Sequence, residues 1–215
     1  MEGRTIYEML KLSSPKVIAM YEAVGFLMEE GRDLYTLKVS DITEKAGIGK
    51  GTAYEYFETK DELISKAIFY QIQSSVRRMA KAVEKEESFR EKIYALMNYM
   101  DKNHSRYQML TKSLCYYIQG LFREKKCMNQ LECSVREDEE MRDFFKGLLV
   151  QASREGLARE DLPGYFMQSA VVTQILAYSM HIGGGFGAEE ISPETMKEYT
   201  YKSILSALQT AGELV

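Results

Sequence analysis

An uninterrupted amphipathic segment runs from Lys60 to about Glu86, and it constrains the fold more than any other feature of the sequence. Apolar residues recur in it every three or four positions, which is the period of one face of an α-helix. This stripe comprises Leu63, Ile64, Ala67, Ile68, Ile72, Val76, Met79 and Val83. Only 3 prolines occur in 215 residues, and no stretch of β-branched residues alternates with polar ones as a half-buried strand would. We therefore predict an all-α protein.

Helix-starting and helix-stopping residues divide the rest of the chain into further helices. Ser14-Pro15 is a typical helix start and Gly31 a typical stop, and short helices are expected over residues 36–46 and 50–57. Later helices are expected to begin near Ser88, Ser105, Met128, Arg136, Asp161 and Ser192. The sequence thus predicts about nine or ten helices in two domains. Residues 1–60 would form a small N-terminal domain, and residues 61–215 a larger helical domain entered through the long fourth helix.

Composition and cysteine usage indicate a reduced protein of the cytoplasm. Hydrophobic residues make up 45% of the chain and charged residues 28%, which is ample for a buried core. No apolar run approaches the roughly 20 residues that span a bilayer, so no membrane partner is expected. The N-terminus lacks the layout of a signal peptide. Cys115, Cys127 and Cys133 have no CxxC spacing, so we expect no disulfide framework, no metal site and no cofactor.

The segment 39–60 predicts a helix-turn-helix. Two short helices that cross steeply need a turn residue that tolerates positive φ, and Gly47 supplies it. The crossing needs small or apolar side chains, which are Ile42, Ala46, Ile48, Ala53 and Phe57. The second helix then presents Lys50, Thr52, Tyr54 and Tyr56 on its outward face. These side chains offer hydrogen-bond donors and aromatic hydroxyls.

The same segment resembles the DNA-binding signature of the tetracycline-repressor (TetR) family of transcriptional regulators. The resemblance rests on Gly51-Thr52-Ala53-Tyr54-Glu55-Tyr56-Phe57, followed by Lys60-Asp61-Glu62-Leu63 at the next helix start. Chain length and helical layout are also similar, although the C-terminal part diverges among family members. Thr43 stands where alanine is common and Ala53 where a larger aliphatic residue is common. These departures predict looser packing between the two short helices.

The resemblance implies that operator DNA is the partner of this segment. Lys50, Gly51, Thr52 and Tyr54 would face base edges in the major groove, with Gly51 allowing close approach of the backbone. The residues implied to hold phosphates are Ser40, Tyr56 and Lys60. At Lys60 the dipole of the fourth helix would favour a phosphate as well. Packing in a half-buried position is the alternative role for the two tyrosines.

The charge balance requires that this DNA affinity come from a few well-placed groups. The chain has a formal net charge of −4, whereas nucleic-acid-binding domains are often basic. Residues 38–60 hold Lys38, Lys45, Lys50 and Lys60 against Asp41, Glu44, Glu55 and Glu58, which leaves no net charge. Individual cations and backbone amides must therefore supply the contacts that a broad positive surface would otherwise make.

The C-terminal part, from about residue 88, is where a regulator would sense a small molecule. It is rich in methionine and tyrosine, which can line an adaptable apolar pocket. The candidate ligand-binding residues are Met100, His104, Met109, Tyr116, Tyr117, Phe145 and Tyr178. For each of them a structural role in the core is the alternative. An unknown apolar or aromatic inducer is the expected ligand.

Two apolar segments, 137–157 and 161–181, predict a homodimer. Small residues at spacings of three and four allow helices to approach closely, so two such helices per subunit would form a four-helix bundle about a two-fold axis. The candidate interface residues are Phe144, Leu148, Ala152, Phe166, Ala170, Thr173 and Ala177.

Taken with the resemblance, these features predict a DNA-binding regulator, specifically a repressor released from a palindromic operator by its ligand. A helical adaptor that acts through protein contacts on the same fold is the main alternative. An all-α di-iron enzyme would need two Glu-x-x-His pairs, and the sequence offers only Asp101-x-x-His104 and Tyr178-x-x-His181. No catalytic residues are therefore expected.

Overall fold

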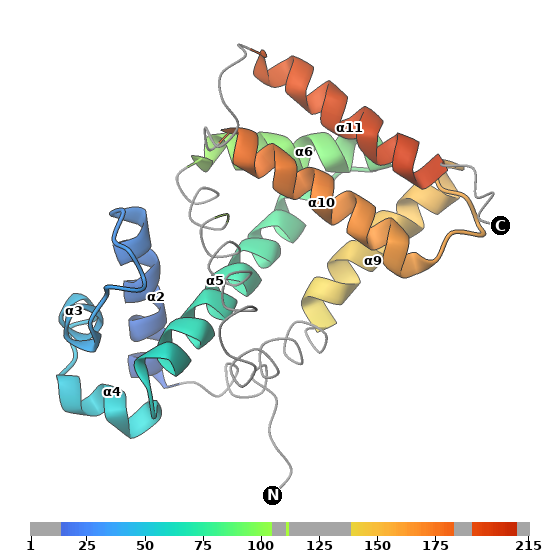
Figure 1. The fold of residues 1–215 in the computed structure, drawn as a ribbon. Helices are drawn as coiled ribbons and strands as arrows, with labels where there is room; N and C mark the ends of the chain where they lie inside the picture. The colour runs from blue at the N-terminus through green and yellow to red at the C-terminus, as the bar shows by residue number, and fades with distance from the viewer. Residues whose placement is uncertain (1–13, 105–110, 112–138, 183–190, 210–215) are drawn as a thin grey trace, which may run out of the picture. The chain divides into compact units, whose positions relative to one another are not determined.

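A computed structural model describes residues 14–104, 111, 139–182 and 191–209. These residues contain eight helices and no strand, which confirms the prediction of an all-α protein (Figure 1). In chain order the helices are α2 (Pro15–Glu29), α3 (Val39–Lys45), α4 (Lys50–Tyr56), α5 (Lys60–Val83), α6 (Phe89–Lys102), α9 (Glu139–Arg154), α10 (Gly164–Ile182) and α11 (Pro193–Gln209). The helices expected to start near Ser105 and Met128 lie outside the described residues.

The described residues form two compact units, and α5 contributes to both. The first unit contains α2, α3, α4 and α5 as far as Ser75. The second contains the rest of α5, from Val76, together with α6, α9, α10 and α11. The domain boundary predicted from the sequence, after residue 60, lies at the N-terminus of α5. That residues 1–60 form the DNA-binding domain stays a prediction.

Helix α2 begins and ends where its punctuating residues predict. The Ser14 hydroxyl accepts a hydrogen bond from the Val17 N–H at 3.4 Å, and Pro15 is the first helical residue. This arrangement satisfies one of the N–H groups that a helix start leaves without a partner. Just after the helix, Gly31 has φ of 80°, a conformation that glycine adopts without steric cost. The chain can therefore turn sharply toward α3.

The prediction of a helix from residue 36 was wrong at its start, because α3 begins only at Val39. A local turn occupies the preceding residues. The Asp33 carboxylate accepts a hydrogen bond from the Tyr35 N–H at 2.9 Å, and the Thr36 hydroxyl donates to the Asp33 carbonyl at 3.1 Å. Short polar side chains that bind nearby backbone groups in this way favour turns over helices.

The core of the first unit contains most of the apolar seam expected between the two short helices. Ile42, Ala53 and Phe57 are buried, and Ala46 and Ile48 are half-buried. Leu63 and Ile64 at the start of α5 are also buried. The two short helices, which are too brief to be stable alone, are thus held by tertiary packing.

Gly25 of α2 is buried where the Gln71 side chain of α5 donates to the Tyr21 carbonyl at 3.0 Å. A Cβ on residue 25 would lie 2.5 Å from Gln71 Nε2. We therefore expect Gly25→Ala to displace the amide and lose its hydrogen bond. The cost of about 1–3 kcal/mol should exceed the roughly 1 kcal/mol that alanine gains in helix propensity. Denaturant unfolding measures it, and an equal effect of Gly25→Ala in a Gln71→Ala background would contradict the explanation.

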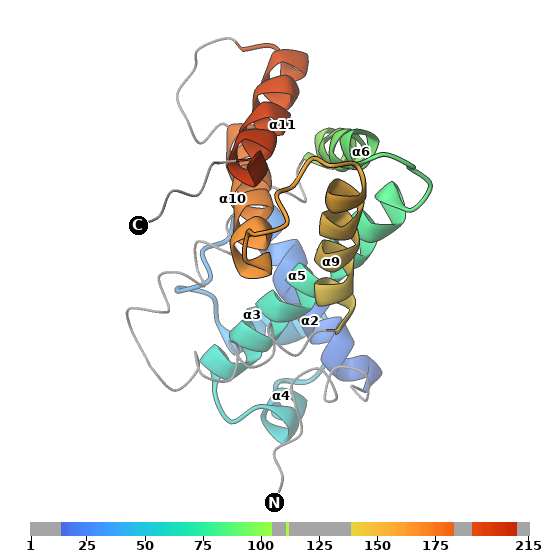
Figure 2. The ribbon, with the colours of Figure 1, turned by 90° about the vertical axis from the view of Figure 1, so that its right-hand side faces the viewer.

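In the second unit, α10 and α11 lie side by side and α6 packs against both (Figure 2). Their buried residues include Phe89, Ile93, Leu96, Met97, Met100, Tyr178, Ile204 and Leu208. A polar cluster joins the three helices within this core. Asp101 of α6 lies 2.6 Å from Lys197 Nζ of α11 and accepts a hydrogen bond from the Tyr178 hydroxyl of α10 at 2.6 Å.

Glu198 of α11 binds two side chains of α6. The Arg90 guanidinium donates to its carboxylate at 2.7 Å, and the Tyr94 hydroxyl donates to the same oxygen. The guanidinium also lies over the rings of Tyr94 and Tyr201, 4.7 and 4.8 Å from their centroids. The hydrogen bonds from Tyr94 and Arg90 lower the pKa of Glu198 to about 2.

This low pKa predicts acid sensitivity. Since the folded-state pKa of Glu198 lies below its ordinary value, the ionised carboxylate stabilises the folded protein at neutral pH. That contribution is lost as the pH falls from about 4.5 toward 2. We expect Glu198→Gln to flatten the pH dependence of the unfolding free energy in this window, measured by denaturant unfolding at a series of pH values. An unchanged pH dependence would show that folding does not lower the pKa of Glu198.

Candidate nucleic-acid interface

The connection between α3 and α4 has the geometry of a helix-turn-helix. Gly47 has φ of 67°, and the Ile48 N–H donates to the Thr43 carbonyl at 2.8 Å, which closes the end of α3. The Thr43 side chain is buried, and its hydroxyl lies 3.0 Å from the Val39 carbonyl, to which it donates. A threonine is therefore accommodated at this position with its polar group satisfied inside its own helix.

Helix α4 separates buried from exposed residues as a recognition helix must. Ala53 faces the core, whereas Lys50 and Gly51 at the N-terminus of the helix are exposed. Tyr54 and Tyr56 are 54% and 40% exposed, so neither ring is a core packing residue. Their hydroxyls and aromatic faces are available to a partner outside the chain.

Two further residues of this helix bear on how closely DNA could approach. Thr52 is half-buried on the first turn. A Cβ on Gly51 would meet nothing within 4 Å in the described chain. Packing therefore gives no reason for a glycine at this position, and the lack of a side chain leaves the backbone open to an approaching group.

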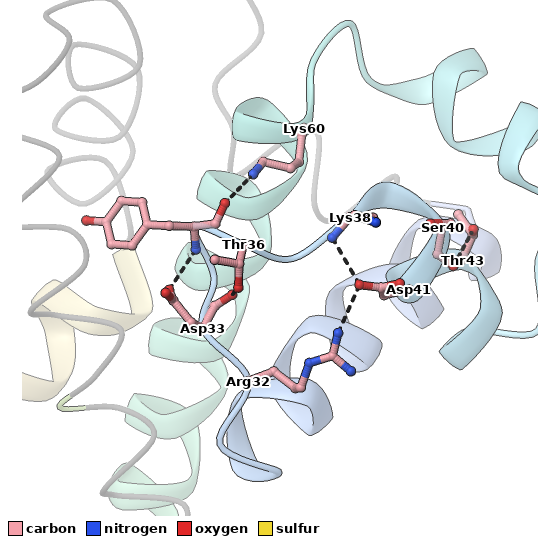
Figure 3. Close-up of polar contacts among 9 residues, drawn as sticks. Arg32, Asp33, Thr36, Lys38, Ser40, Asp41, Thr43 and Lys60 are labelled. Atoms are coloured by element: carbon pink, nitrogen blue, oxygen red, sulfur yellow. Dashed lines mark hydrogen bonds and ion pairs between the residues drawn. The ribbon is translucent and has the colours of Figure 1, made fainter.

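The residues predicted to hold phosphates lie around the N-terminus of α3 and the start of α5 (Figure 3). Ser40 is in the first turn of α3 and is half-buried. Lys60, the first residue of α5, donates from Nζ to the Tyr35 carbonyl at 2.9 Å. A lysine ammonium carries three donors, so this bond positions the cation and leaves two donors for another acceptor.

Sequence reasoning assigned no role to two cations in this region, Arg32 and Lys38. The Arg32 guanidinium donates to Asp41 Oδ2 at 3.0 Å, and the Lys38 backbone N–H donates to the same oxygen at 3.2 Å. The acidic residue three positions after Lys38 could have indicated the cap at the start of α3. Nothing in the sequence indicated that Arg32 would reach that carboxylate, because the contact depends on the turn between α2 and α3.

The candidate ligand-binding residues that the structure describes occupy different environments in the second unit. Met100 and Tyr178 are buried, and burial together with the Asp101 hydrogen bond raises the pKa of Tyr178 above its ordinary value. His104 is exposed, with Nε2 2.6 Å from the Ile182 carbonyl, and Phe145 packs edge-on against Phe144 at 5.1 Å. The remaining candidates, Met109, Tyr116 and Tyr117, lie outside the described residues. The described members thus have structural contacts of their own.

The candidate dimer residues on α9 and α10 also differ in exposure. Leu148 and Ala152 are buried within the chain itself. Phe144, Ala170 and Ala177 are half-buried, whereas Phe166 and Thr173 are exposed. Outside the predicted set, Tyr165 at the start of α10 is 85% exposed. The residues of this group that are available to a partner are therefore mainly on α10.

These observations define the class of protein: an all-α, helix-turn-helix protein whose second short helix presents polar and aromatic side chains. Residues 30–67 match the family model of the bacterial regulatory proteins of the tetR family. The match covers α3, α4 and the start of α5, and it confirms the resemblance that the sequence predicted for this segment. Comparison with curated protein sequences finds no match.

Solved structures of transcriptional regulators share the fold over most of this chain. One from Rhodococcus sp. RHA1 has 13% sequence identity and a TM-score of 0.66, covering 90% of this chain and 94% of its own. A TetR-family regulator from Mesorhizobium loti has 17% identity and a TM-score of 0.63, covering 90% and 95%. FadR from Bacillus subtilis, in complex with stearoyl-CoA, has 14% identity and a TM-score of 0.59, covering 90% of this chain and 98% of its own.

None of the helices in the described part of the chain is long and apolar enough to cross a membrane.

Proposed function

We propose that this regulator is a cytoplasmic repressor that binds a palindromic operator as a homodimer. The observation that carries the proposal is the exposed face of α4, where Lys50, Tyr54 and Tyr56 point away from the core that holds Ala53 and Phe57. A recognition helix inserts its N-terminal residues into the major groove, and two copies related by a two-fold axis require two matching half-sites.

We assign the reading of bases to Lys50, Thr52 and Tyr54, with the open backbone at Gly51 allowing close approach. Residues that flank the helix pair meet the DNA strand instead, so Ser40, Tyr56 and Lys60 would bind phosphates. The bond from Lys60 to the Tyr35 carbonyl supports this role, because it places the cation beside the first turn of α5, where the helix dipole favours an anion.

We further propose that α9 and α10 form the dimer interface. Exposed aromatic side chains on α10, Tyr165 and Phe166, support it, since contiguous exposed apolar groups often mark protein contacts. Leu148 and Ala152 would support the interface from inside the chain and not by direct contact. Sedimentation equilibrium at micromolar concentration tests the proposal, and a species of 24.7 kDa, the mass of one chain, would reject it.

Release from DNA would follow from binding of an apolar or aromatic molecule to the C-terminal helices. The stearoyl-CoA complex of Bacillus subtilis FadR supports an apolar ligand, because that protein has a similar fold. The ligand can weaken DNA binding only by favouring one conformation over another, with a coupling of typically 1–3 kcal/mol. The part of α5 in each unit would transmit the change.

The test begins with selection of binding sites from a pool of random-sequence DNA duplexes by the full-length protein. We expect a palindromic sequence to be enriched, and the same site placed in a reporter promoter to lower expression when the protein is present. Enrichment of no sequence would favour the helical adaptor. Increased reporter expression would keep the DNA-binding function and reject the repressor role.

A further inference from the structure

Three cations border the turn between α2 and α3 and the start of α5: Arg32, Lys38 and Lys60, here called the turn cations (Figure 3). Two of them are held by one hydrogen bond each. Arg32 donates to Asp41 Oδ2 at 3.0 Å, and Lys60 donates to the Tyr35 carbonyl at 2.9 Å. The side chain of Lys38 is exposed. The fold therefore sets the positions of two of the three turn cations, Arg32 and Lys60.

Lys38 is an unusual residue for its position. It is the N-cap of α3, where a side chain that accepts a hydrogen bond normally stabilises the helix start. A lysine ammonium has no acceptor and lies unfavourably at the positive end of a helix dipole. Asp41 provides the cap instead, by accepting the Lys38 backbone N–H at 3.2 Å. The Lys38 ammonium contributes nothing to this cap. An anion outside the chain would stabilise the ammonium in this position.

The Arg32 guanidinium also has more hydrogen-bond donors than its contact with Asp41 requires. It has five N–H donors in a planar fork, of which one reaches Asp41. The Arg32 side chain is 52% exposed. Asp41 thus acts as a positioning residue, because its carboxylate holds the guanidinium and caps α3 at the same time. The remaining donors match the geometry of a phosphate group.

The two carboxylates of this region are already engaged by the chain. Asp33 accepts the Tyr35 N–H at 2.9 Å, and Asp41 accepts from Arg32 and from the Lys38 backbone. At the start of α5, Asp61 and Glu62 lie in the same first turn as Lys60, and the Glu62 carboxylate accepts from the Glu58 N–H and from Lys66. Of the five cations in residues 32–60, three are turn cations and only Lys50 is on α4. The cations of the DNA-binding segment therefore lie mainly at the turn and the start of α5, and not on the recognition helix.

We propose that Arg32 and Lys38 bind phosphate oxygens of the DNA strand beside the groove that α4 enters, together with Lys60. This inference rests on the proposed function as a DNA-binding regulator. It makes the turn the main electrostatic contact with the strand. Affinity that depends on salt would come from this turn, and sequence preference from α4.

The experiment measures binding of full-length Lys38→Gln and Arg32→Gln to the selected operator duplex and to a random-sequence duplex, by fluorescence anisotropy between about 50 and 200 mM salt. Each substitution should reduce the slope of log K against log salt by about 0.9 per half-site. Each should also weaken binding about tenfold on both duplexes, because a phosphate contact carries no sequence information. Lys85→Gln, which removes an exposed lysine between α5 and α6, is the matched control and should retain the wild-type slope.

Melting temperatures separate this effect from loss of structure. Lys38→Gln keeps the backbone bond to Asp41, so its melting temperature should equal that of the wild type. Arg32→Lys, which keeps the charge, should recover most of the salt slope. Wild-type slopes in both glutamine variants would overturn the inference while leaving the proposed function intact. Failure of the wild-type protein to bind any duplex would overturn both.

Discussion

Replacing Asp101 with alanine should lower the free energy of unfolding by about 3 kcal/mol, the lower end of the range for breaking a buried ion pair. The Lys197 side chain is only 9% exposed and lies 2.6 Å from the Asp101 carboxylate. Without that carboxylate the ammonium keeps Asn98 as its partner, at 2.8 Å, and the Tyr178 hydroxyl loses its acceptor. The side chain of Asp101 is itself 28% exposed, so water partly compensates and the upper end of the range is not expected.

A second substitution separates the charge effect from general disruption of the core. In Asp101→Ala/Lys197→Met the buried cation is removed as well, and a flexible apolar side chain occupies its space. We expect this double variant to recover a large part of the lost stability, because an unpaired buried charge costs more than an absent pair. Denaturant unfolding of both variants and of Lys197→Met completes the cycle. Additive losses would show that Asp101 and Lys197 do not stabilise each other.

Thr52→Ala and Tyr54→Ala should each weaken binding to the selected operator by roughly 1–3 kcal/mol and change binding to random DNA much less. Tyr54 is 54% exposed and Thr52 is half-buried, so neither substitution removes a fully buried core side chain. Contacts to base edges are lost only where the matching bases are present. Competition binding against both duplexes measures the difference.

Glu55→Ala is the matched control for this prediction, since it changes an exposed residue of the same helix and removes a carboxylate from near the DNA. It should not weaken binding to either duplex. Equal losses on operator and random DNA for the Thr52 and Tyr54 variants would show that these residues contact the strand and that other residues read the bases.

The N-terminal unit was largely predictable because its signals are local. Gly47 was expected in the turn and has positive φ, and Ile42 and Phe57 were expected in the core and are buried. The start of α3 was misplaced because apolar spacing continues through the preceding turn. The hydrogen bonds from the Tyr35 N–H to the Asp33 carboxylate and from the Thr36 hydroxyl to the Asp33 carbonyl form a turn there instead of a helix.

In the second unit the sequence predicted helices but not the polar groups that connect them. Asp101, Lys197 and Tyr178 lie on three helices that are distant in sequence, and no spacing rule joins them. Tyr178 and Met100 were candidates for ligand binding on composition, and the structure places both in the core. Methionine and tyrosine serve cores and pockets equally well, so composition cannot distinguish these roles.

By itself, the sequence determined the all-α class, the helix-turn-helix and its resemblance to a family signature, because periodicity, glycine placement and a short motif are properties of neighbouring residues. Tertiary structure alone decided that Asp41 would hold both Arg32 and the start of α3, and that Lys197 would be buried beside Asp101. Those contacts form only when separate segments are brought within hydrogen-bonding distance. The free energy of a charged side chain depends on its partners and on its exposure to solvent. Tertiary packing determines both, and sequence spacing determines neither.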